Sequence, residues 1–174
     1  MSSASEILQA RMTSHVDFPQ PGIVFRDITP VLADGPSLRV VVDEMLAPFA
    51  GQFDAVAGLE ARGFIFAAAA ARSAGVGVIP IRKAGKLPGR VLRESYQLEY
   101  GDATFEVNPE WLEPGSRVLI MDDVLATGGT ANAAVSLVEQ AGWTVVGVSV
   151  ALELVDLSGR QQIGSHRVHS LLTL

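Results

Sequence analysis

Two adjacent acids followed by a glycine-rich turn form the most informative stretch of the chain. Asp122 and Asp123 come directly after the apolar run 117–121, and the string ATGGT follows at 126–130, where a helix is predicted to begin. Glycines let the backbone turn tightly there, and successive N–H groups at a helix N-terminus bind phosphate. Two acids beside such a cradle suit a ligand that also offers hydroxyl groups, as a ribose phosphate does. The predicted phosphate loop comprises Ala126, Thr127, Gly128, Gly129 and Thr130.

A second anion site is predicted at 58–64, where the sequence GLEARGF joins a strand to a helix. Arg62 could hold an anion with two parallel N–H donors of its guanidinium, next to Glu60 and Ala61. A glutamate that caps the helix and an arginine on the surface are the alternative.

The basic residues are unevenly distributed, and this points to a third segment. Of the 13 basic residues, 11 are arginines and two are lysines, and both lysines lie within four residues of each other beside Arg82. Lys83 and Lys86 on their own would indicate a solvated loop. Together with two anion sites, their mobile charges suit a multiply charged ligand such as pyrophosphate.

Two further segments display aromatic residues. The sequence ESYQLEYGD at 94–102 predicts a hairpin that closes over the site as a lid and carries Tyr96, Glu99 and Tyr100. A solvated hairpin with its tyrosines packed down is the alternative. The sequence DFPQPGIVFRD at 17–27 predicts a proline-fixed loop that exposes Phe25, with a packed N-terminal arm as the alternative.

Alternating strands and helices must position these segments. Apolar runs predict buried strands at 54–59, 76–81, 117–121 and 144–152. Helical spacing, caps and composition predict helices at 3–12, 36–49, 63–72 and 130–141. A hairpin is predicted from strands at 96–100 and 104–107, which flank Gly101 and Asp102. This alternation indicates an α/β fold with a mostly parallel sheet, in which ligands bind at the carboxyl ends of strands.

Composition excludes several classes of function. The 174 residues carry a formal net charge of −6, are 48 % hydrophobic and include no cysteine. We therefore expect one domain with a substantial core, and no disulfide framework, thiolate nucleophile or cysteine-bound metal. The acidic total argues against nucleic acid as a partner, and no apolar stretch approaches the roughly 18 residues of a membrane span. We expect a cytoplasmic protein without a membrane partner.

The five segments together resemble, in order and spacing, the type I phosphoribosyltransferase family. VLIMDDVLATGGT at 118–130 is similar to the family's motif for 5-phosphoribosyl-1-pyrophosphate (PRPP), and 94–102 and 17–27 resemble segments of its adenine-specific members. The resemblance implies one domain over 1–174. Its parts would be an N-terminal arm and base-binding hood at 1–34 and an α/β core at 35–174. That core would hold a mostly parallel sheet flanked by helices and a flexible lid hairpin at about 84–109.

The resemblance also implies a reaction, in which adenine and PRPP give AMP and pyrophosphate. It implies Mg²⁺ bound mainly through pyrophosphate oxygens and water, with no direct protein ligand. It further implies a homodimer with the region near 82–86 at or near the interface. Asp122 and Asp123 would accept the ribose hydroxyls, and 126–130 would hold the 5′-phosphate.

Roles for the remaining residues follow from the same resemblance. The implied pyrophosphate-binding residues are Glu60, Ala61, Arg62, Arg82, Lys83 and Lys86, with a cis peptide bond between Glu60 and Ala61. The implied adenine-binding residues are Val24, Phe25, Arg26 and Val124. Phe25 would stack on the base, the backbone groups of Val24 and Arg26 would read its edge, and Val124 would close the opposite face.

That reaction also requires a group that exchanges a proton with the base. Related purine enzymes carry a carboxylate where this chain has Ala126, and alanine cannot transfer a proton. Glu99 on the lid is the predicted acid/base, because closure over the site would raise the pKa of its carboxyl. Alternatively, water transfers the proton, or Glu99 only helps to order the lid.

Two other functions stay open at this stage. A regulator with the same fold could bind PRPP without catalysis, although the acidic chain shows neither a basic surface nor an added DNA-binding segment. An enzyme for another base, such as hypoxanthine or a pyrimidine, is the nearer alternative. The segments at 17–27 and 94–102 favour adenine.

Overall fold

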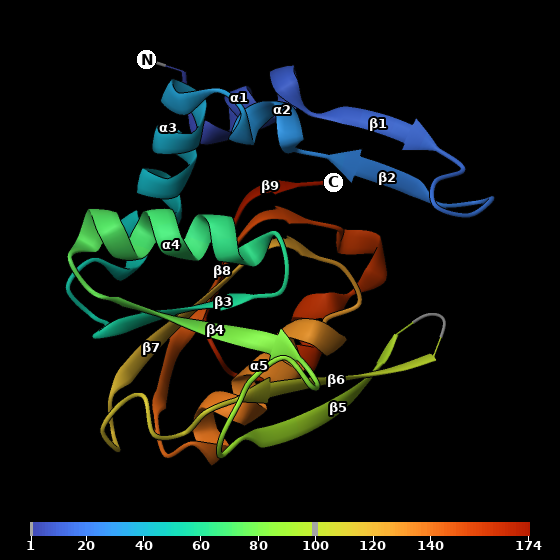
Figure 1. The fold of residues 1–174 in the computed structure, drawn as a ribbon. Coiled ribbons are helices and arrows are strands. Elements are labelled where there is room, and N and C mark those ends of the chain that lie inside the picture. The colour runs from blue at the N-terminus through green and yellow to red at the C-terminus, as the bar shows by residue number, and fades with distance from the viewer. Residues whose placement is uncertain (1, 99–100) are drawn as a thin grey trace.

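A mixed seven-stranded sheet forms the centre of the fold in the computed structural model, which describes residues 2–98 and 101–174 (Figure 1). The strand order is β5-β6-β4-β3-β7-β8-β9, and the five strands from β4 to β9 run parallel, while β6 is antiparallel to both β4 and β5. The sheet strands are β3 (Ala55–Leu59), β4 (Gly77–Lys83), β5 (Leu92–Leu98), β6 (Gly101–Val107), β7 (Arg117–Leu125), β8 (Thr144–Glu153) and β9 (Val168–Thr173). The α/β prediction is confirmed.

Helices cover both faces of this sheet. They are α1 (Ala4–Arg11), α2 (Thr29–Leu32), α3 (Gly35–Leu46), α4 (Gly63–Ala74) and α5 (Gly129–Gln140), with 3-10 turns η1 (Ala47–Phe49), η2 (Val155–Leu157) and η3 (Gly159–Ile163). The predicted capping box is present, since the Ser3 hydroxyl accepts the N–H of Glu6 and the Glu6 carboxylate accepts the N–H of Ser3. Gly75 ends α4 in the left-handed conformation, with a φ of 71°.

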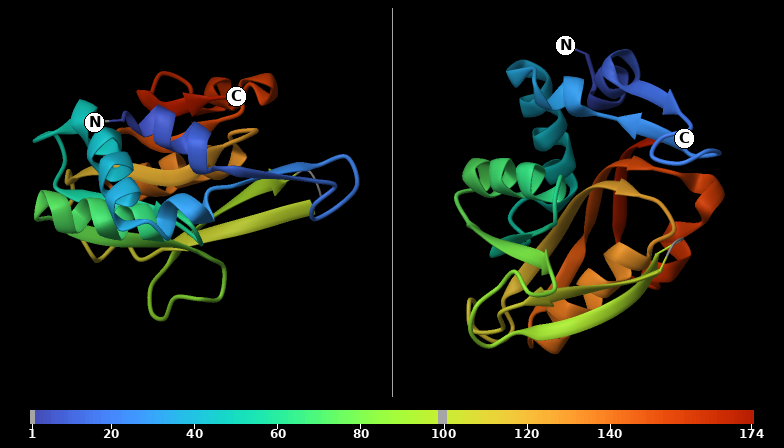
Figure 2. Two further views of the ribbon diagram at one scale, coloured as in Figure 1. Left: turned by 90° about the horizontal axis from the view of Figure 1, so that it is seen from above. Right: turned by 45° about the vertical axis from the view of Figure 1, so that its right-hand side comes forward.

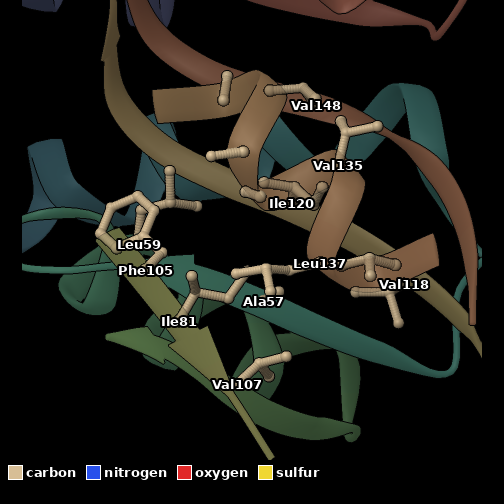
Figure 3. Packing of buried hydrophobic residues seen from close by; sticks show 14 of the residues in the cluster. Ala57, Leu59, Ile81, Phe105, Val107, Val118, Ile120, Val135, Leu137 and Val148 are labelled. Carbon is tan, nitrogen blue, oxygen red and sulfur yellow. The ribbon is translucent and has the colours of Figure 1, made fainter. Parts of the chain in front are cut away.

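Strand alternation divides the core into two layers. Val118 and Ile120 of β7 pack against α5, in the layer drawn in Figure 3. Leu119 and Met121 of the same strand point to the other face and pack against α1, α3 and α4. All four side chains are fully buried. The central strand β7 is therefore held rigidly from both sides, and it leads directly into the predicted phosphate loop.

Two hairpins project from the same side of this core (Figures 1 and 2). One is the antiparallel pair of β1 (Thr13–Val16) and β2 (Val24–Asp27), which includes the predicted hood residues. The other is β5–β6. The carboxyl ends of the parallel strands face the space between them, where an α/β sheet binds its ligands.

The structure differs from the sequence-based prediction in several elements. The strand predicted to end at residue 121 continues to Leu125, because β8 pairs with it up to that residue. Gly101 and Asp102, predicted as the turn of the lid, lie within β6. Strands β1, β2 and β9 were not predicted, since all three are short and lack a buried alternating face. Among the described residues, no helix is both long and apolar enough to cross a membrane.

Candidate active site

The phosphate loop joins the end of β7 to the start of α5. Gly128 has a φ of 89°, a left-handed conformation that favours glycine, and Gly129 begins the helix. The first N–H groups of α5 have no carbonyl partner within the helix, so they are free to bind an anion. This arrangement confirms the predicted strand–turn–helix geometry at 126–130. What binds there stays a prediction.

The two acids lie in the last part of β7 before this loop, and they differ in their contacts. An Asp123 side-chain oxygen lies 2.6 Å from the Arg62 guanidinium, and its side chain is 9 % exposed. The Oδ1 of Asp122 accepts the N–H of Asp123 at 2.9 Å. Withdrawal from water and the neighbouring charge of Asp123 raise the pKa of Asp122 well above its ordinary value, against a weaker opposing effect of Arg62.

Close approach of α4 to β7 brings Arg62 to these acids. A Cβ atom on Gly63 would lie 2.8 Å from Oδ1 of Asp122 and 2.9 Å from the carbonyl oxygen of Met121, so a side chain there would push the two elements apart. Arg62 immediately precedes α4 and occupies its N-cap position. Its guanidinium also lies 5.1 Å from the centre of the Phe25 ring, within the range of a cation–π contact.

Arg62 thus connects the acid pair to the hood. Phe25 contacts the Arg62 guanidinium and also packs in an edge-to-face arrangement with Phe18, whose ring centre is 5.3 Å away. The Arg26 side chain turns aside and donates to the Ser14 hydroxyl at 2.6 Å. The guanidinium of Arg26 is therefore committed within the hood, which is compatible with base recognition through the backbone at this position.

A cavity of about 420 Å³ joins the hood to the phosphate loop. Its lining residues are Ile23, Val24, Phe25, Arg26, Arg62, Val124, Ala126, Thr127, Thr130, Leu154 and Leu157. All four predicted adenine-binding residues therefore meet three phosphate-loop residues and Arg62 in one space. Such a cavity has room for a ligand with an aromatic ring at one end and a phosphate at the other.

Sequence reasoning missed three of the lining residues, namely Ile23, Leu154 and Leu157. Leu154 follows β8 directly, and Leu157 ends the short turn η2. The only sequence signal for Leu154 is its place at the carboxyl end of a predicted parallel strand, where a side chain can reach the ligand edge of the sheet.

Of the six predicted pyrophosphate residues, Arg62 lines this cavity and the other five do not. The Glu60–Ala61 peptide bond is cis, as predicted. The Glu60 carboxylate accepts the N–H of Lys83 at 2.9 Å and a guanidinium N–H of Arg82 at 3.3 Å. Burial opposes ionisation of Glu60, but these donors hold the pKa of its carboxyl below the ordinary value. The Glu60 carboxylate therefore holds the basic segment by accepting hydrogen bonds from Arg82 and Lys83.

A second buried carboxylate shapes the rest of the basic loop. Glu106 of β6 is fully buried, and its Oε1 accepts the N–H groups of Lys86 at 2.8 Å and Leu87 at 2.7 Å. Arg93 donates to the other oxygen at 3.3 Å. Although burial opposes it, these donors lower the pKa of Glu106. The backbone around Lys86 is thus folded about one anionic side chain.

The lid residues are only partly described. Tyr96 packs on Phe105, with ring centres 4.9 Å apart, so this part of the hairpin is attached to the core. Burial and the nearby Asp122 raise the pKa of the Tyr96 phenol, and the Thr130 side chain opposes this shift. Tyr96 therefore lies beside the acids and the phosphate loop. Glu99 and Tyr100 lie outside the described residues.

Replacing Asp122 by Asn is expected to stabilise the fold at neutral pH. A carboxyl whose pKa is raised by folding destabilises the native state once the pH exceeds its unfolded value of about 4, and the cost is complete above its folded pKa. The substituted amide would keep an acceptor for the N–H of Asp123 and remove the charge that faces Asp123 and Tyr96. Urea unfolding should show D122N more stable than the parent at pH 7, with the difference vanishing near pH 4.

Asp54 offers a control of opposite sign. Hydrogen bonds from Arg117 lower the pKa of Asp54 to about 2, so its charge stabilises the native state above pH 4 and this contribution is lost as the pH falls towards 2. D54N should therefore be less stable than the parent at pH 7. A D122N protein that is no more stable than the parent at pH 7 would contradict the raised pKa of Asp122.

Known proteins match this chain along nearly its whole length. The phosphoribosyl transferase domain family matches residues 39–162. The adenine phosphoribosyltransferase of Clavibacter michiganensis subsp. michiganensis is 60 % identical over 171 residues, which cover 98 % of this chain and 97 % of that protein. The crystal structure of the Rhodothermus marinus adenine phosphoribosyltransferase is 48 % identical and has a TM-score of 0.93, covering 98 % of each chain. That of Saccharomyces cerevisiae, complexed with an imino-altritol bisphosphate and adenine, is 36 % identical and has a TM-score of 0.92, covering 97 % of this chain and 98 % of that chain. This chain therefore belongs to the phosphoribosyltransferase family.

Proposed function

We propose that this protein transfers the 5-phosphoribosyl group of PRPP to adenine, giving AMP and pyrophosphate in purine salvage. The observation that carries the proposal is the single cavity that joins the Phe25 hood to the loop at 126–130. The similarity to adenine phosphoribosyltransferases, one of them complexed with adenine, supports the choice of base. An aromatic side chain at one end and a helix N-terminus at the other suit the base and phosphate of AMP.

In this reaction N9 of adenine forms a bond to C1′ of the ribose as the bond from C1′ to the pyrophosphate oxygen breaks. The base loses one proton, and positive charge develops on the sugar in between. Asp122 and Asp123 accept the ribose hydroxyls and place negative charge beside the sugar. Burial beside Asp123 raises the pKa of Asp122, and hydroxyl donors or positive charge on the sugar would favour its ionised form.

Pyrophosphate leaves towards the basic segment. Arg62, Arg82, Lys83 and Lys86 supply positive charge there, and the cis peptide bond after Glu60 lies at the edge of the same segment. The two carboxylates that hold this segment, Glu60 and Glu106, use their oxygens on its backbone and on Arg82 and Arg93. The lysine ammonium groups themselves therefore remain available to the leaving group.

Mg²⁺ fits this arrangement as a partner of the substrate. Within residues 2–98 and 101–174, no group of three or more His, Asp or Glu side chains could surround a metal ion. Mg²⁺ gives up its bound water reluctantly, so oxygen atoms of pyrophosphate and water are suitable ligands for it. When bound, Mg²⁺ would neutralise the charge of the departing pyrophosphate.

A base panel tests the proposed function. With PRPP and Mg²⁺, the protein should convert adenine to AMP, with a kcat/KM at least about a hundredfold above those for hypoxanthine, guanine and uracil, because each mismatched buried hydrogen bond costs about 1–3 kcal/mol. Chromatography of the nucleotide products measures this. PRPP binding without turnover of any base would support the regulator instead, and preferred use of hypoxanthine would reassign the substrate.

Replacing Glu99 by Gln tests the proposed acid/base. General acid–base catalysis contributes about 10²–10⁴-fold, so the chemical step of E99Q should slow by that factor in single-turnover experiments. Glu94→Gln is the matched control, since Glu94 lies on the same hairpin and binds Gln140 at 2.8 Å. A loss in E99Q below about threefold, with an unchanged pH profile, would limit Glu99 to ordering the lid.

A homodimer completes the proposal, with the region near 82–86 at or near the interface. Two large apolar side chains on adjoining elements support it, because Ile65 of α4 is 43 % exposed and Val78 of β4 is 44 % exposed. Sedimentation should give a particle of twice the 18.4 kDa chain mass. Ile65→Asp should shift it towards the monomer, whereas a fully active monomer of the parent protein would exclude the dimer.

A further inference from the structure

The segment that follows β8 packs against the back of the phosphate loop. A Cβ atom added to Gly159 would overlap the carbonyl oxygen of Ala126, and one added to Gly128 would overlap the carbonyl oxygen of Gly159. The two backbones are therefore in direct contact, with no side chain between them. Any movement of residue 159 is transmitted to the loop, because no flexible group can absorb it.

Arg160 anchors this contact through a buried carboxylate. Its Nε donates to Oε1 of Glu153 at 2.9 Å, and a second guanidinium nitrogen donates to the other oxygen. The third guanidinium nitrogen donates to the carbonyl oxygen of Val168 at 2.9 Å. Ser170 donates to Glu153 at 2.6 Å, and the Glu153 side chain is only 7 % exposed. A planar, bidentate pair of this kind fixes the orientation of the Arg160 guanidinium relative to the Glu153 carboxylate, as well as the distance between them.

Glu153 is itself fixed relative to the loop. It ends β8 and pairs in register with Leu125, the residue before the loop begins. Leu154 then donates its N–H to the carbonyl oxygen of Leu125 at 2.9 Å. After Glu153 the chain leaves the sheet beside the phosphate loop, and at Gly159 it contacts that loop again. Arg160 holds this part of the chain to β8 and β9. We call the segment from Glu153 to Arg160 the bracket, because these contacts hold it against residues 126–128.

We infer that Arg160, through Glu153 and Gly159, is a positioning residue that holds the loop at 126–130 in the conformation that binds the 5′-phosphate of PRPP. This inference rests on the proposed function. Arg160 acts without touching the substrate. Its effect is geometric, since several backbone N–H groups can converge on one phosphate only while the loop keeps its shape.

The decisive variant is Arg160→Met, which keeps an unbranched side chain as far as the position of Nε and removes every donor. Its KM for PRPP should rise about tenfold or more, while its KM for adenine and its kcat change by less than about threefold. Calorimetry should show a matching loss of affinity for AMP. Arg160→Lys retains the charge but not the bidentate pair, so it should restore part of the PRPP affinity.

Arg117→Met is the matched control. Arg117 forms a bidentate pair with Asp54, at 2.6 and 3.1 Å, at the other end of β7 and away from the cavity. It should leave both KM values within about twofold of the parent. Gly159→Ala gives a second probe, because it displaces the loop without altering Arg160 or Glu153 and should reproduce the PRPP-specific loss.

Circular dichroism at the assay temperature verifies that each variant is folded. A folded R160M with unchanged KM for PRPP, or with equal losses for PRPP and adenine, would overturn the inference. If R160M does not fold, G159A decides by the same criteria. If the parent protein neither turns over PRPP nor binds AMP, the proposed function fails, and this result is distinct from a parent that is active and a variant that is unaffected.

Discussion

The structure depends on one electrostatic constraint, which is a pair of adjacent carboxyl groups held at the end of a buried central strand. Withdrawal from water and, secondly, the adjacent charge of Asp123 raise the pKa of Asp122. Arg62 compensates Asp123 at 2.6 Å, and α4 can approach closely enough to supply it only because residue 63 is glycine. Arg62 in turn supports Phe25 of the hood. The acid pair, the start of α4 and the hood residue Phe25 therefore form one connected unit.

Around this unit, buried carboxylates fix the conformation of the basic loop and of the segment behind the phosphate loop. Glu60 and Glu106 accept backbone N–H groups of the basic loop, and Glu153 holds the segment that braces the phosphate loop. Each of the three has a pKa below its ordinary value because its donors outweigh burial. An acidic net charge is thus compatible with the proposed site for phosphates, since these three acids are occupied by donors of neighbouring segments.

Under the proposed function, stability and activity would oppose each other at the acid pair. Burial and the charge of Asp123 cost folding free energy at Asp122, and a ribose with developing positive charge would offset this cost. Glycines at 63, 128 and 159 likewise leave no side chain to fill space, and each permits a backbone approach that a Cβ atom would block. At these three positions direct contact with the backbone therefore replaces side-chain packing.

The sequence by itself determined the local features. The strand–acid–loop–helix order at 118–130, the capping box at Ser3 and the alternation of strands with helices depend on neighbouring residues, so composition and spacing predict them. Resemblance added the hood and the cis bond at Glu60. Only the tertiary structure decided that β7 continues through both acids, because pairing with β8 extends it. It alone brought Leu154, Leu157 and the rest of the bracket to the site. Those contacts join residues about 30 positions apart through backbone packing and a buried ion pair, and no local pattern encodes such a meeting.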